Sequence, residues 1–66
     1  MTTDQIINQL TINALEIIGK SRNEIERTCW VVVHEYCNGA KPSEYDIREI
    51  DESLYLKVLE RVKGQL

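Results

Sequence analysis

The stretch Ser21–Cys37, SRNEIERTCWVVVHEYC, decides the fold, because its local signals conflict and its length resolves them. The run of Trp and three Val at 30–33 is aromatic and β-branched, which favours a strand. Ser21, however, stands three residues before Glu24, which is the spacing of a capping box at a helix start, and Gly39 follows as a helix stop. About 17 residues between such signals is long for a strand and ordinary for a helix. The sequence therefore predicts a helix.

This predicted helix, over about 22–37, has an apolar face wider than one packing contact requires. At about 100° per residue, its apolar side chains span an arc of about 160°. Upstream, a second amphipathic helix is predicted over about 4–18, with an apolar arc of about 180° and Gly19 as its C-terminal stop. Arcs this wide fit helices that each pack against two neighbours, in the same chain or in a partner chain.

The C-terminal third of the chain divides at Asp51. One continuous helix from Glu44 to Lys63 would place the Asp51 carboxylate in the middle of an apolar face, at a large desolvation cost. A break at this position lets Asp51 cap a separate helix instead. The predicted fold is all-α, a small bundle of three to four helices completed by oligomerisation. Its single domain spans 1–66, with helices at about 4–18, 22–37, 44–50 and 52–63.

Length and composition set the class of protein. A chain of 66 residues forms one domain, in a size range where a single core seldom suffices without a disulfide, a metal, a partner or oligomerisation. We therefore expect a homo-oligomer such as a homodimer. The sequence holds no run of about 18 apolar residues, so we expect a cytoplasmic protein that does not enter a membrane. The net charge of −3 argues against binding to nucleic acid.

The two cysteines are expected to be reduced core residues. Cys29 and Cys37 are eight residues apart. On one helix this is about 12 Å of rise, beyond the roughly 7 Å Cα limit for a disulfide. His34 and Cys37 share a helical face, but the further ligands that zinc needs are missing. We therefore expect no metal site, and we place His34 at the boundary of the apolar face.

Three patterns suggest chemistry that the rest of the sequence does not support. The segment Ala14–Ser21 fits a loose phosphate-loop pattern, but such a loop follows a strand of a parallel sheet, which this chain is too short to build. A catalytic triad lacks a placed nucleophile beside the single His. A helix-turn-helix would present acidic residues to the phosphates of DNA. We therefore expect no enzyme activity, no catalytic residue and no cofactor.

The leading prediction is a small non-catalytic binding protein that acts as a regulator, inhibitor or adaptor of a larger intracellular protein. The acidic stretch at 44–52 favours docking on a basic surface of that partner. The residues predicted for partner docking are Glu44, Tyr45, Asp46 and Glu49. The residues predicted for self-association are apolar and lie off the main core stripes, namely Ile12, Trp30, Val33 and Cys37.

An alternative of a different class is a small-ligand-binding protein whose site forms at an oligomer interface. An anionic, nucleotide-like ligand would need cationic side chains and an aromatic ring for stacking. The residues that could provide them are Arg22, Arg27, His34 and Tyr36. A screen of small anions separates the two predictions, because a ligand raises the melting temperature of the protein that binds it.

Overall fold

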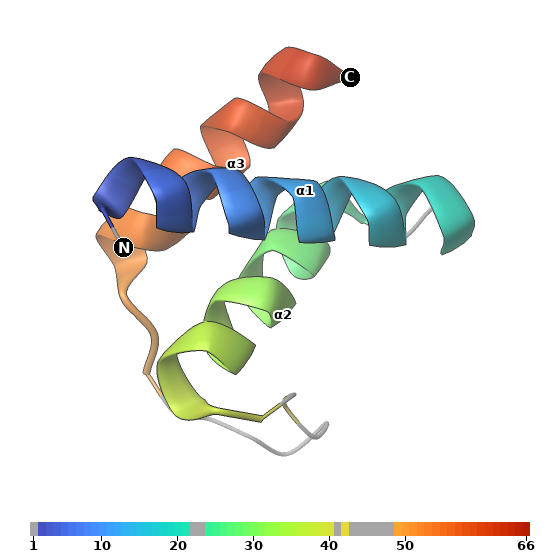
Figure 1. Ribbon diagram of the computed structural model, residues 1–66. Coiled ribbons are helices and arrows are strands. Elements are labelled where there is room, and N and C mark those ends of the chain that lie inside the picture. The colour runs from blue at the N-terminus through green and yellow to red at the C-terminus, as the bar shows by residue number, and fades with distance from the viewer. Residues whose placement is uncertain (1, 22–23, 41, 43–48) are drawn as a thin grey trace.

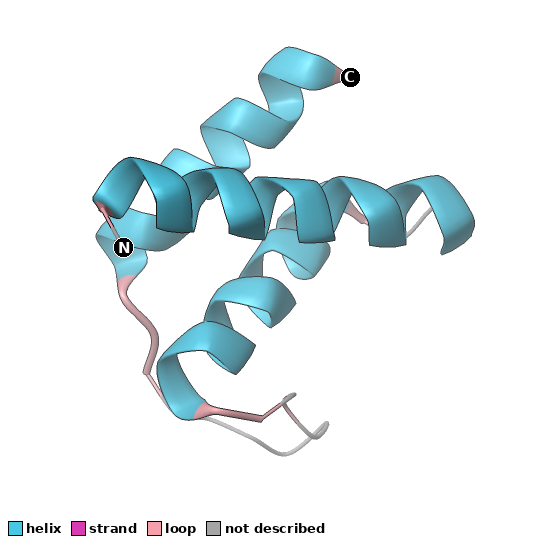
Figure 2. Cartoon of the chain, viewed as in Figure 1, coloured by secondary structure: helices cyan, strands magenta, loops and turns pink. Residues whose placement is uncertain are grey.

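The computed structural model describes residues 2–21, 24–40, 42 and 49–66. These residues form three helices and no strand, so the predicted all-α bundle is confirmed (Figures 1 and 2). The run of Trp and three Val at 30–33 is helical throughout. The length of the segment therefore decides its structure, and the strand preference of these four residues does not. The helices are α1 (Thr3–Ser21), α2 (Ile25–Asn38) and α3 (Glu52–Gln65).

Helix α1 is longer than the sequence predicts at its C-terminal end. It continues through Gly19 to Ser21, so the prediction that Gly19 ends it is wrong. A glycine inside a helix costs about 1 kcal/mol relative to Ala, which weakens a helix but does not stop it. Ser21 consequently belongs to α1, and the predicted start of α2 is displaced. The cap position of α2 is Glu24, which makes no side-chain capping hydrogen bond.

The start of α1 carries the capping box that the sequence suggests for α2. The backbone N–H of Thr2 donates to Gln5 Oε1 at 2.9 Å, and the N–H of Gln5 donates to Thr2 Oγ1 at 3.2 Å. Two backbone amides that lack a partner inside the helix are thereby satisfied. The corresponding signal in the sequence is the T-x-x-Q spacing of Thr2 and Gln5.

Two other helix ends follow the sequence signals. Gly39 ends α2 with φ 77°, the left-handed conformation that glycine adopts without strain, and its N–H donates to the Glu35 carbonyl. The Asp51 carboxylate accepts the Leu54 N–H at 3.1 Å, so Asp51 caps α3 as predicted. The short helix predicted at 44–50 lies mostly outside the described residues. Its last two residues, Glu49 and Ile50, are described and are not helical.

The hydrophobic core lies where α1 crosses over α2 and α3 (Figure 1). All three pairs of helices are in contact. The principal-axis extents are 30 × 29 × 15 Å, so the molecule is thin, since one helix with its side chains is about 10–12 Å wide. Each helix contributes three buried residues: Ile7, Leu10 and Ala14 from α1, Cys29, Val32 and Val33 from α2, and Leu54, Val58 and Val62 from α3.

Two residues of α2 differ from their predicted environments. His34 is fully buried rather than at a boundary, because the Trp30 ring packs on it with 4.9 Å between centroids. Its Nδ1 also lies 3.1 Å from the Ala40 carbonyl oxygen. A carbonyl can only accept, so Nδ1 carries the proton in this hydrogen bond. Cys37, predicted in the core, is exposed, because the C-terminal end of α2 extends beyond the cover of α1 (Figure 1).

Cys29 lies in the core as predicted and is a free thiol. Burial raises its pKa to about 11, although the ammonium of Lys63 acts in the opposite direction. The thiol therefore stays protonated and unreactive at neutral pH.

Candidate binding groove between helices α1 and α2

Helix α3 packs along one flank of α1 and fixes which flank remains open. Arg61 of α3 donates a hydrogen bond from Nη1 to Oδ1 of Asn8 on that flank. A second polar contact, an exposed ion pair of 4.0 Å between Lys63 and Glu26, joins α3 to α2. The opposite flank of α1 faces α2, which covers only part of that flank. The uncovered part forms a groove.

The groove lies between α1 and α2 and has a volume of about 480 Å³. Its floor is apolar, with the buried side chains of Leu10 and Val32 and the partly buried Ile6 and Ile17. On α1, Ile6, Leu10 and Ile17 follow spacings of four and seven, which place side chains on one face of a helix. The wide apolar arc of α1 is therefore shared between the core and an open surface.

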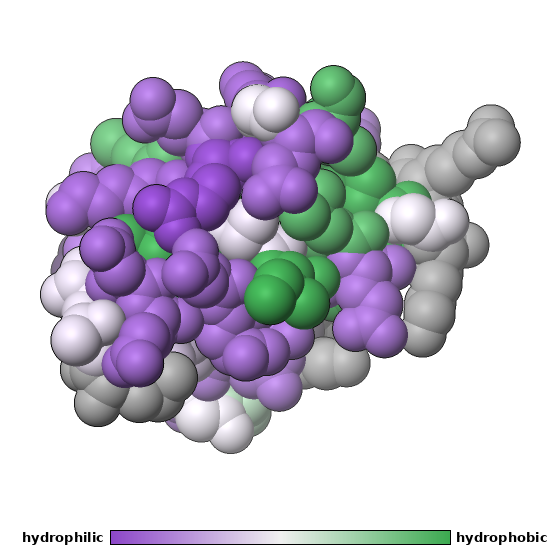
Figure 3. Space-filling model, turned by 45° about the horizontal axis from the view of Figure 1, so that its top comes forward, coloured by the Kyte–Doolittle hydropathy of each residue, from purple (hydrophilic) through white to green (hydrophobic). Residues whose placement is uncertain are grey.

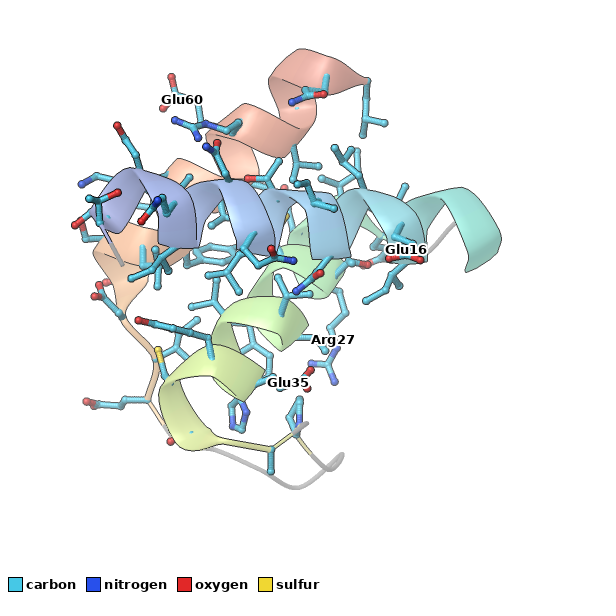
Figure 4. The ribbon with its side chains drawn as sticks, viewed as in Figure 1. Glu16, Arg27, Glu35 and Glu60 are labelled. Atoms are coloured by element: carbon cyan, nitrogen blue, oxygen red, sulfur yellow. The ribbon has the colours of Figure 1, made fainter. Side chains whose placement is uncertain are left out.

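The rim of the groove is polar. On α1, Gln9 and Asn13 are one turn apart, and the Gln9 amide donates to Asn13 Oδ1 at 3.1 Å. Glu16 of α1 and Glu35 of α2 add two exposed carboxylates, and Tyr36 adds a side chain that is 51% exposed. Figure 4 shows these glutamates on the side of α1 away from Glu60 of α3.

Two carboxylates, those of Glu16 and Glu35, line the groove among the residues that the structure describes. Glu16 also takes part in a further interaction within the chain. The groove therefore combines an apolar floor with a polar rim.

The other hollows in the described part of the chain are more polar. One lies between the start of α1 and the C-terminal half of α3, where Asp4, Lys57, Glu60 and Arg61 line it. A smaller set of residues around Glu24 and Lys63 lines another. Charged side chains line both, so neither presents the apolar floor that the α1–α2 groove has.

The structure separates the four residues predicted for self-association. Val33 is fully buried in the core of its own chain, so it has no surface to offer a second copy. Ile12 is 57% exposed on α1, whereas Trp30 is partly buried on α2 and packs against His34. Cys37 is exposed near the end of α2. Val33 is therefore removed from the predicted set, and self-association through the other three residues stays a prediction.

Two other exposed apolar side chains lie on or next to α3. Leu56 of α3 is 56% exposed, and the C-terminal Leu66 is 66% exposed. Figure 3 shows the hydrophobic side chains of one face gathered mainly from its upper right to its centre, with smaller hydrophobic areas at the left.

Three of the four residues predicted for partner docking, Glu44, Tyr45 and Asp46, lie outside the described residues. The fourth, Glu49, is exposed and precedes α3. The prediction of an acidic docking segment at this position consequently stays a prediction.

Of the three described residues of the anionic-ligand alternative, Arg27 and His34 both lie against the Trp30 ring, whereas Tyr36 lies on the groove. Arg22 lies outside the described residues, and His34 is buried. The guanidinium of Arg27 lies 5.4 Å from the centre of the Trp30 ring. Tyr36 lines the groove nine residues further along α2, which is about 13 Å of helix rise from Arg27. The carboxylates beside Tyr36 would repel an anion.

The structure adds two limits on function within the residues that it describes. No group of three or more His, Cys, Asp or Glu is placed to hold a metal ion in that part of the chain. Every helix there is too short or too polar to span a lipid bilayer.

The groove is not predicted from the sequence, although one feature of its rim can be recognised there. The row of uncharged amides on α1, including Gln9 and Asn13, is noticeable in the sequence as an unusual polar face. Periodicity alone does not show which flank of α1 another helix covers, so the amides could not be assigned to a groove.

Comparisons with known proteins give a family and no function. A search of curated proteins and a search of solved structures each found no match. A family model described as Domain of unknown function (DUF8662) matches residues 5–66, which is nearly the whole chain. By this match the chain belongs to the DUF8662 family.

Proposed function

We propose that this chain is a non-catalytic binding module, a regulator, inhibitor or adaptor of a larger intracellular protein, and that its partner docks in the α1–α2 groove. The observation that carries the proposal is the open flank of α1, whose apolar floor of Ile6, Leu10 and Ile17 is bordered by polar side chains. Protein interfaces have the same arrangement, because a dry apolar centre supplies affinity and a polar rim supplies specificity.

A non-catalytic role fits the chemistry of the groove. Its titratable side chains are Glu16, Glu35 and Tyr36, and all three are exposed. General acid–base catalysis by carboxyl groups ordinarily uses groups that are held out of water. The thin molecule also has little interior in which a substrate could be enclosed.

Self-association in the cytoplasm remains within the proposal. The exposed side chains of Ile12, Leu56 and Leu66 would lose apolar surface to water if a second copy covered them. The acidic segment before α3, of which Glu49 is described, would add charge to a second docking contact on the same partner.

The anionic-ligand alternative has less support from the geometry. Arg27 and His34 both lie against the Trp30 ring, but the His34 side chain is fully buried and Tyr36 lies apart from them on the groove.

Photo-crosslinking in the native host tests the proposed function. Tyr36, in the groove, is replaced by the photoreactive p-benzoylphenylalanine, and the matched control carries the same group at Glu60 on the far side of α1. We expect irradiation to give a discrete adduct with a larger protein from the Tyr36 position and not from the Glu60 position. A third variant carries the photoreactive group at Asn13, a second position in the groove. Equal labelling from Tyr36 and Glu60 would contradict the proposal. The absence of an adduct from both Tyr36 and Asn13 would also contradict it.

A further inference from the structure

We draw no further inference here: the strongest candidate, the α1–α2 groove with its apolar floor of Ile6, Leu10 and Ile17, belongs to the site already described, and nothing in the structure shows what covers it.

Discussion

The two flanks of α1 have different neighbours. On one flank, α3 buries Leu54, Val58 and Val62 against the core and holds Asn8 through Arg61. On the other flank, Ile6 and Ile17 are only partly buried at the floor of a groove. The comparison shows that the apolar face of α1 is wider than α2 and α3 can cover. Its uncovered part, at the floor of the groove, is the surface that a partner would contact most.

The largest difference between the flanks should appear on truncation of core side chains. We expect Leu54→Ala, on the covered flank, to lower the free energy of unfolding by about 2–4 kcal/mol, because it removes buried contacts and leaves a cavity. The matched change Ile17→Ala, in the partly exposed groove, should lower it by less than half as much. Urea unfolding measures both values. Equal losses would show that the groove is as well packed as the core and would remove the contrast between the flanks.

The two thiols report the same contrast through their reactivity. Cys29 lies in the core and Cys37 at the open end of α2, so we expect a disulfide reagent at pH 8 to label Cys37 about a hundredfold faster or more. Mass spectrometry of time points, with Cys37→Ser to isolate the Cys29 reaction, measures the two rates. Similar rates would mean that the core opens readily and that Cys29 is not protected.

The buried thiol also gives a pH dependence. Its pKa is raised by burial from 9.0 to about 11, so the folded state holds this proton more tightly than the unfolded state. The resulting stabilisation is fully present below pH 9 and is lost as the pH rises through about 11. We expect Cys29→Ala to flatten this alkaline loss in urea titrations, whereas Cys37→Ser should leave it unchanged.

A smaller effect should follow from removal of the cap that positions α3. We expect Asp51→Ala to lower the free energy of unfolding by about 1 kcal/mol, because the Leu54 N–H loses its acceptor. The conservative change Asp51→Asn keeps an acceptor and should recover most of the loss. Helix α2, whose cap position Glu24 makes no side-chain hydrogen bond, provides the comparison. There Glu24→Ala should change stability by less than about 0.5 kcal/mol.

The sequence predicts the parts of the fold that depend on local chemistry. The break at Asp51 follows from the cost of a carboxylate on an apolar face, and the end of α2 follows from the tolerance of Gly39 for a left-handed conformation. Both signals act within one turn of the chain. The helical state of the 30–33 run also follows from its length and its flanking residues.

The features that the sequence does not predict depend on neighbours from elsewhere in the fold. His34 looks like a boundary residue on a helical wheel, but the Trp30 ring and the chain at Ala40 cover it. Cys37 looks like a core residue, but nothing in the described part of the chain covers it. The groove has the same origin, because the pattern of α1 gives the width of its apolar face and not the position of α3.

The equal contribution of three core residues from each helix has a consequence for how the chain opens. Loss of any one helix would remove a third of the core and expose the buried faces of the other two. Partial opening is therefore costly, and amide hydrogen exchange in all three helices should proceed mainly through one global event. A protease should likewise cut the three helices mainly from the unfolded state. A partner would consequently bind the three helices as one rigid unit, through the surface that the folded chain already exposes.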